Sequence, residues 1–316
     1  MSRRVIDFRS DNTHGASPEI LEAIARANTD TITSYGGDAI TARLQKRIAE
    51  LFEHDVAIFP VLTGTAGNAL TLGAMAGAND TIVCHEDAHI IRDELGAPEL
   101  FTGGAKLLPL AGANGKLHDV PDTRVLSLTN ATEAGTVYTP DELRALCDRA
   151  ERVHLDGARF ANAVASLGAS PADLTWRAGV DVLVLGATKN GALGAEVIIA
   201  FDKTLEETLA PLWHRSGHRV SKMRFLSAQL EAYLTDDLWL RNARHANAMA
   251  QRLARGLGAS LIHPVEANVV FTRLAKPVDG FLYYDWPIFG DDAYRLVTAF
   301  DTREEDVDAF LAAVHA

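Results

Sequence analysis

Short apolar runs alternate with patterns of helical period along most of this 316-residue chain. The apolar runs predict seven strands, at residues 56–60, 81–84, 106–110, 124–128, 152–155, 181–185 and 197–201. Helical patterns lie between several of them, at 65–76, 139–151 and 172–177. Strands that alternate with helices indicate an α/β fold, in which a mostly parallel seven-stranded sheet carries helices on both faces.

The last part of the chain has a different pattern. A long helix is expected from about residue 222 to 258, with a break near Asp236-Asp237, followed by strand-like runs at 268–273 and 293–300 and a closing helix at 304–313. These elements predict a small α+β domain. The expected division is an extended N-terminal arm (1–15), a large domain (16–235) and a small C-terminal domain (236–316).

Charge and cysteine content narrow the class of protein. The chain has 30 basic and 42 acidic residues, a net charge of -12, and this balance argues against a nucleic-acid or anionic-membrane partner. No apolar stretch has the length of a membrane span, and no apolar run follows the basic start, so we expect no signal peptide. Cys84 and Cys147 lack CxxC spacing and are typical of reduced thiols in a cytoplasmic protein.

A lysine follows the most apolar of the predicted strands. The run Val182–Leu185 ends at Gly186, and Lys189 comes three residues later. Open α/β sheets bind ligands beyond the carboxyl ends of their strands. Partial desolvation at such a place lowers the pKa of a lysine and makes its amine a Schiff-base nucleophile. Taken alone, the pattern favours an ordinary exposed loop lysine.

A second feature is a strand-to-helix turn with the sequence Thr63-Gly64-Thr65-Ala66-Gly67-Asn68. Small residues let a ligand approach the backbone, and the first N–H groups of a helix attract anions. The turn is therefore a candidate phosphate site, although it is neither a P-loop nor a GxGxxG fingerprint. An ordinary tight turn explains it equally well.

A third feature ends the strand at 152–155. Asp156 is placed to pair with a protonated ring nitrogen, and Arg159 to grip a carboxylate. The plainer explanations are a helix N-cap for Asp156 and a surface ion pair for Arg159. An anion site, an aspartate and a lysine on one edge of a sheet together match pyridoxal 5'-phosphate, whose imine and protonated ring store the electrons of a Cα carbanion.

The segment His85-Glu86-Asp87-Ala88-His89 formally matches the HExxH zinc signature. The motif directly follows a predicted strand, and Gly96-Ala97-Pro98 leaves no room for the long helix that zinc-binding histidines need. A zinc hydrolase is therefore a remote alternative. A histidine here is better used as a flat ring packed on an aromatic cofactor.

The chain resembles the low-specificity L-threonine aldolases, in the β-eliminating-lyase branch of fold-type-I pyridoxal-phosphate enzymes. The resemblance runs from Asp7 to the C-terminus and rests on seven motifs in the family's order. They are Asp7-Phe8-Arg9-Ser10-Asp11-Asn12, Tyr35-Gly36-Gly37-Asp38, Thr63–Asn68, Cys84–His89, Asp156-Gly157-Ala158-Arg159, Thr188-Lys189-Asn190-Gly191 and Tyr294-Arg295-Leu296-Val297-Thr298.

The resemblance implies roles for individual residues. Lys189 is the Schiff-base lysine, Asp156 the partner of the ring nitrogen and His89 the ring that stacks on the cofactor. The remaining roles fall to residues that bind phosphate (Gly64 and Thr65, with Lys222 or Arg224 across an interface), that bind substrate (Ser10, Arg159 and Arg295) and that reach a neighbouring subunit (Tyr35). The family forms dimers and tetramers with sites at the dimer interface.

The sequence also departs from the family. Gly36-Gly37-Asp38 stands where many members have Gly-Asp-Asp, and Thr132 takes the place of a second active-site histidine. The loops at 116–124 and 276–294 are shorter than usual, and the second shortening is expected to cost the small domain a helix. These changes leave open which group accepts the substrate's hydroxyl proton. The candidates are His89 and a water molecule, either of which His85 or Thr132 could assist. His85 is also a candidate for contact with the substrate.

The expected activity is cleavage of L-threonine, L-allo-threonine or phenylserine-type β-hydroxy-α-amino acids into glycine and an aldehyde. The same groups can serve β-elimination, racemisation or transamination, and a non-catalytic binding protein on this fold is a further alternative. No nucleic acid, membrane or metal is expected, and the protein is expected to be a homo-oligomer.

Overall fold

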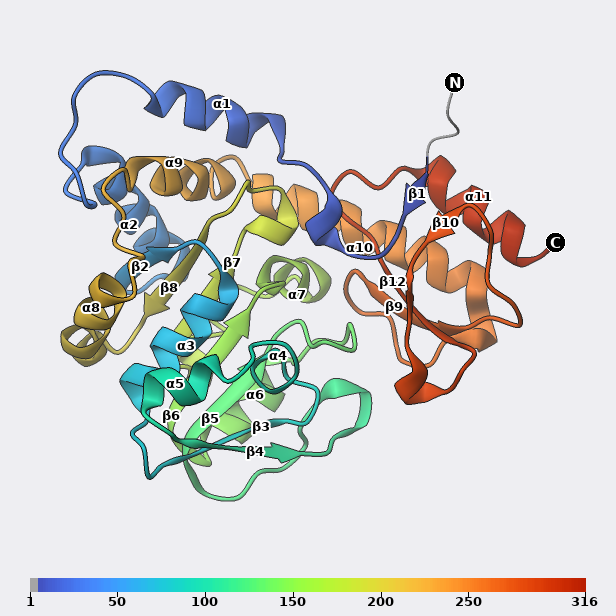
Figure 1. Ribbon diagram of the computed structural model, residues 1–316, viewed down its shortest axis with the longest axis horizontal. Helices are drawn as coiled ribbons and strands as arrows, with labels where there is room; N and C mark the ends of the chain where they lie inside the picture. Colours follow the sequence, from blue (N-terminus) through green and yellow to red (C-terminus); the bar gives the residue numbers. More distant parts are fainter. Residues whose placement is uncertain (1–4) are drawn as a thin grey trace.

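Seven strands form one large sheet in the computed structural model of the protein, which describes residues 5–316 (Figure 1). The strands are β2 (Ala57–Val61), β3 (Thr81–His85), β4 (Lys106–Leu110), β5 (Thr123–Thr129), β6 (Ala150–Gly157), β7 (Val182–Gly186) and β8 (Glu196–Ala200). Their order is β2-β8-β7-β6-β5-β3-β4, and only β8 runs antiparallel to its neighbours. The predicted mostly parallel seven-stranded sheet is confirmed.

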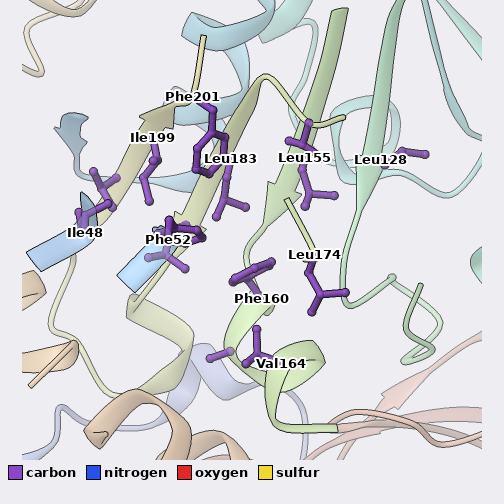
Figure 2. Close-up of a cluster of buried hydrophobic side chains, with 14 of the residues drawn as sticks. Ile48, Phe52, Leu128, Leu155, Phe160, Val164, Leu174, Leu183, Ile199 and Phe201 are labelled. Carbon is purple, nitrogen blue, oxygen red and sulfur yellow. The ribbon is translucent and has the colours of Figure 1, made fainter. Parts of the chain in front are cut away.

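The sheet has a hydrophobic core on each face, and β7 shows why a strand at its centre is apolar throughout. All five of its residues are buried. Val182 and Val184 belong to the core on one face, whereas Leu183 and Leu185 belong to the core on the other. Figure 2 shows part of the second core, with Leu183 beside side chains from other strands and helices. A strand covered on both faces reads as a continuous apolar run.

Helices cover both cores. One face carries α3 (Gly64–Met75) and α8 (Glu206–Arg215). The opposite face carries α2 (Ala39–Phe52), α6 (Pro140–Cys147), α7 (Phe160–Leu167), α9 (Arg224–Tyr233) and the start of α10 (Leu238–Leu257). The other helices are α1 (Pro18–Ala27), which packs along α9, the short α4 (His89–Arg92) and α5 (Ala97–Thr102), and the closing α11 (Glu304–Val314).

Two predicted helices differ from those observed. No α-helix forms at 172–177; the segment is turns followed by a 3-10 turn at Trp176–Ala178. Thr175 Oγ1 donates to the Pro171 carbonyl at 2.6 Å, which closes the chain into a tight turn. The helix expected over 139–151 ends at Cys147, because β6 already begins at Ala150. The predicted break near Asp236-Asp237 separates α9 from α10, and both aspartates have left-handed backbone.

The second domain is built on a small antiparallel sheet. It has the order β11-β12-β9, where β11 is Tyr284–Asp285, β12 is Ala293–Val297 and β9 is Val269–Arg273. Segment 276–294 holds short strands and a 3-10 turn, and no α-helix, as expected from its length.

The N-terminal segment is tied to this second domain. β1 (Ile6–Asp7) pairs in parallel with β10 (Phe281–Leu282). Phe8 is 1% exposed and packs edge-on against Phe310 of α11, with ring centroids 5.7 Å apart. The chain then turns through Ser10–Thr13 back toward the large sheet, as the blue ribbon in Figure 1 shows. Because residues 6–8 are anchored on the second domain, the position of the turn that follows them is also determined.

Gly67 sets how closely α3 approaches the sheet. A Cβ at this position would lie 2.5 Å from Val184 Cγ1, a stiff side chain inside β7. We expect Gly67→Ala to lower the free energy of unfolding by about 1–3 kcal/mol, because the overlap outweighs the gain in helix propensity. Urea denaturation measures the change. Gly77→Ala, which meets only a carboxylate oxygen at 3.7 Å, is the matched control, and an equal effect of both substitutions would contradict this packing account.

Candidate functional site

The site lies at the carboxyl ends of β6 and β7. Asp156 is the penultimate residue of β6, and Lys189 lies in the 3-10 turn Thr188–Asn190 directly after β7. A cavity at this edge is lined by His89, Thr129, Ala131, Glu133, Asp156, Ala158, Arg159 and Lys189. The structure therefore brings together four residues that the sequence singled out from separate segments: His89, Asp156, Arg159 and Lys189.

Lys189 is partly buried and unpaired. Within residues 5–316 its amine has no hydrogen bond or ion pair, although it borders the cavity. Burial lowers the pKa of Lys189, and the positive charge of Arg159 adds to the effect. The turn that carries it is held by Glu196, whose carboxylate accepts the Ala187 N–H at 3.2 Å and the Thr188 N–H at 3.4 Å. A lowered pKa increases the fraction of the amine that is neutral, and therefore nucleophilic, at a given pH.

Asp156 is fixed by hydrogen bonds to both carboxylate oxygens. Oδ1 accepts the Ala158 N–H at 2.9 Å, and Oδ2 accepts from Asn68 Nδ2 at 2.8 Å. Asn68 Oδ1 in turn lies 3.1 Å from His154 Nε2, and His154 Nδ1 lies 2.9 Å from Ser127 Oγ. Burial lowers the pKa of His154 to about 4, so it stays neutral and donates through Nε2. This buried chain holds the Asp156 carboxylate in one orientation.

Asn68 also connects the phosphate-site candidate to Asp156. It is the fifth residue of α3, which begins at Gly64, so the two residues are about 6 Å apart along the helix axis. Thr63 caps the helix by accepting the Ala66 N–H at 3.2 Å. The N–H groups of Gly64 and Thr65 have no partner in the structure, and a Cβ on Gly64 would meet no atom within 4 Å. Unpaired N–H groups therefore face open space at the same edge as Lys189.

His89 is held through its ring by a buried carboxylate. Its Nδ1 lies 2.9 Å from Oε1 of Glu94, whose side chain is fully buried and also accepts from Asn68 Nδ2 at 2.8 Å. The hydrogen bond to Glu94 raises the pKa of His89, and the charge of Asp156 adds to this shift. Glu94 and Asp156 thus share one amide, which fixes the position of His89 relative to Asp156.

We expect Glu94→Gln to lower the pKa of His89. Glutamine keeps an oxygen that accepts the ring N–H but removes the charge that favours the cation, so the ring becomes neutral at a lower pH. NMR titration of the His89 ring in labelled protein measures the midpoint. The exposed Glu86→Gln serves as the charge-matched control. An unchanged His89 midpoint in Glu94→Gln would contradict the assigned contact.

Arg159 forms a buried two-bond ion pair with Asp11. Arg159 Nε and Nη2 donate to the Asp11 carboxylate at 2.8 and 2.9 Å, and their side chains are 10% and 1% exposed. Asn268 Nδ2 adds a third hydrogen bond to Asp11 at 3.1 Å. Burial alone would raise the pKa of Asp11, but Arg159 and Lys189 keep it below its usual value. Arg159 Nη1 has no partner in the described chain and remains available at the cavity.

Arg295 approaches the same place from the second domain. Burial and the nearby Arg159 lower the pKa of Arg295 to about 10. Its guanidinium lies over the Trp286 ring, 5.6 Å from the centroid. Ser10 caps the turn before Asp11, with its Oγ accepting the Asn12 N–H at 3.1 Å. Two guanidinium groups that repel one another bind an anion well, because the anion relieves their repulsion.

Other predicted residues lie away from the cavity wall. Tyr35 is 48% exposed, and its N–H donates to Ser221 at 3.0 Å, which places it beside the exposed Lys222. Arg224 is bound to the carbonyls of Thr29 and Asp30 at 2.9 and 3.1 Å.

His85 and Thr132 are both occupied by the protein. Nδ1 of His85 accepts the Asp87 N–H at 3.0 Å, and its Nε2 lies 3.1 Å from the Gly112 carbonyl. Thr132 is fully buried and its Oγ1 lies 2.8 Å from Thr136 Oγ1. Neither side chain borders the cavity. In residues 5–316 no group of three or more His, Cys, Asp or Glu side chains is arranged to hold a metal ion, so nothing gathers around the HExxH motif.

Sequence reasoning missed four residues that the structure places here: Asp11, Asn68, Glu94 and Glu133. Asp11 and Asn68 lie inside motifs that the sequence had singled out, although neither was given a role. No motif in the neighbouring sequence marks Glu94 or Glu133, because each is connected to the site through the fold, by a contact with His89. Glu133 Oε1 accepts the His89 backbone N–H at 2.9 Å and the Thr129 hydroxyl at 3.2 Å.

Comparisons with known proteins agree on one family. The β-eliminating lyase family matches residues 7–277. A low-specificity L-threonine aldolase of Pseudomonas aeruginosa is 41% identical, with 97% of this chain and 96% of that protein covered. One from a Pseudomonas species is 40% identical, with 98% and 97% covered. A solved structure of Leishmania major threonine aldolase superposes with a TM-score of 0.90 at 26% identity, covering 98% of both chains.

Proposed function

This chain belongs to the β-eliminating lyase family, and we propose that it is a pyridoxal-phosphate-dependent aldolase that splits L-threonine and related β-hydroxy-α-amino acids into glycine and an aldehyde. The observation that carries the proposal is the cavity that an unpaired, partly buried Lys189 shares with a fixed Asp156 and Arg159. The full-length aldolase relatives give the reaction class.

The residues present fit pyridoxal phosphate. Lys189 supplies an amine of lowered pKa for its aldehyde, and Asp156 a carboxylate for its ring nitrogen. The unpaired N–H groups of Gly64 and Thr65 suit its phosphate, and the ring of His89 suits its aromatic face. When bound, the cofactor withdraws electrons from the bonds at the substrate's Cα.

The protein's part is to bind and orient the substrate. Arg159 Nη1 and the guanidinium of Arg295 are placed to hold the substrate carboxylate, with Ser10 as a further donor. Asp11 fixes Arg159 from the opposite side, so the carboxylate site keeps its geometry. By holding the carboxylate, these residues would orient the substrate and so determine which bond at Cα is activated. With its lowered pKa, the Lys189 amine would be able to accept or deliver a proton at the substrate's Cα.

The alternative reactions, racemisation, β-elimination and transamination, can be tested on the same purified protein. We propose that the purified protein, supplied with pyridoxal phosphate, converts L-threonine and L-phenylserine into glycine and aldehyde in equal amounts. L-alanine tests racemisation, an O-acyl serine tests β-elimination, and a keto-acid acceptor tests transamination. Turnover of these substrates without threonine cleavage would replace the aldolase by a sister enzyme; the aldolase relatives favour cleavage.

We also propose a cytoplasmic homo-oligomer with sites at subunit interfaces. Both cysteines are free and buried, and none of the described helices is long and apolar enough to cross a membrane. Leu62 and Leu193, next to the Gly64 and Lys189 segments, are 45% and 63% exposed, and exposed large apolar side chains near a site suit an interface between subunits. Light scattering gives the subunit number. A monomer that is fully active at assay concentration would overturn this arrangement.

A further inference from the structure

Cleavage needs a group that accepts the proton of the substrate's β-hydroxyl, and this inference rests on the proposed function. As the Cα–Cβ bond breaks, the hydroxyl oxygen becomes a carbonyl oxygen and must lose its proton. His85 and Thr132 are occupied and lie off the cavity. His89 borders the cavity, but its Nδ1 is already bound to Glu94 and the face of its ring is assigned to the cofactor.

Glu133 has the geometry that these residues lack. Its Oε1 is occupied by the His89 N–H and the Thr129 hydroxyl. Its Oε2 makes no hydrogen bond or ion pair with another residue within residues 5–316 and is not sealed from solvent, and the side chain borders the cavity that holds Lys189. One carboxylate oxygen is therefore anchored while the other is free beside the reacting centre.

We propose that Glu133 is the general base that takes the β-hydroxyl proton during cleavage. The proton passes from the hydroxyl oxygen to Oε2, directly or through one water, as the C–O single bond becomes the C=O double bond of the aldehyde. The electron pair of the Cα–Cβ bond goes to Cα, which is then protonated to give glycine. Glu133 releases its proton to solvent, so the sum is one β-hydroxy-α-amino acid converted into glycine and aldehyde with no further reactant.

The surroundings of Glu133 suit this role. Burial raises the pKa of Glu133, and the nearby charge of Asp156 adds to the rise. A carboxylate of raised pKa is a stronger base and transfers protons more effectively near neutral pH. Thr129 and the His89 N–H hold the carboxylate in place, which limits the cost of orienting it.

The test is Glu133→Gln in the holoenzyme, because glutamine keeps an oxygen for the His89 N–H and Thr129 but cannot accept the proton. We expect kcat for L-threonine cleavage to fall by about 10²–10⁴-fold. Exchange of the α-hydrogen of glycine with D2O involves no hydroxyl, and we expect its rate to stay within about threefold of the parent. The glycine dissociation constant, read from the cofactor's absorption, should likewise be unchanged.

The pH profile gives a second readout. The cleavage rate of the parent should decline as the pH falls through the pKa of Glu133, because a protonated carboxyl group cannot accept the hydroxyl proton. The rate of Glu133→Gln should not show this decline at acidic pH. Parental cleavage by Glu133→Gln, or equal losses of cleavage, glycine exchange and glycine binding, would overturn the assignment. Glu86→Gln is the charge-matched control. A parent enzyme that exchanges glycine but cleaves no β-hydroxy amino acid would instead contradict the proposed function itself.

Discussion

We expect Lys189→Ala to lower the rate of L-threonine cleavage by about 10³-fold or more, because no other lysine among residues 5–316 lines the cavity to bond the cofactor's aldehyde. The visible absorption of lysine-bound cofactor should disappear as well. The variant should fold at least as well as the parent, since it removes a partly buried cation that has no ion-pair partner among residues 5–316.

The control is Lys203→Ala. Lys203 is half-exposed and bound to Asp55, away from the cavity, so its loss should leave rate and absorption unchanged. If Lys189→Ala retained near-parental turnover, the amine would act elsewhere and the scheme would be wrong.

Asp156→Asn is the second large effect. Both carboxylate oxygens accept hydrogen bonds, from Ala158 and Asn68, so an amide at this position faces one donor with its own NH2 group. The substitution also removes the negative charge expected to stabilise a protonated ring. We expect kcat to fall by about 10²–10³-fold, the range seen when one fixed electrostatic partner of a reacting group is removed.

A surface substitution distinguishes this effect from a general loss of charge. Asp173→Asn breaks an exposed pair with Arg177 and should leave cleavage unchanged. Cleavage by Asp156→Asn at the parental rate would show that the fixed carboxylate is not required.

The central strands of the large sheet were predictable because burial on both faces produces a continuous apolar run. Val182–Gly186 is wholly buried, and the sequence is wholly apolar up to its glycine. The segment at 172–177 was not predictable in the same way. Its composition allows a helix, but Thr175 bonds back to Pro171 and the chain turns instead, a local competition that periodicity does not report.

The site residues likewise include some that were predictable from the sequence and some that were not. Lys189, Asp156 and the turn at Gly64 follow strands, and parallel strands carry such residues to one edge. Glu94 and Glu133 could not be assigned from the sequence, because an isolated acidic residue reads as solvated surface. Only the fold brings Glu94 to the ring of His89 and Glu133 to its backbone. Arg159 and Asp11 are likewise far apart in sequence and meet because the N-terminal arm returns to the sheet.

The most direct test of the account is to reduce the cofactor-loaded enzyme with borohydride and map its tryptic peptides by mass spectrometry. The account predicts a reduced pyridoxyl phosphate group on Lys189, in a peptide that runs from Ala178 to Lys203 because trypsin does not cut at a modified lysine. Prior addition of L-threonine should diminish the label. A label on another lysine, or none on a protein that cleaves threonine, would contradict the central role of Lys189.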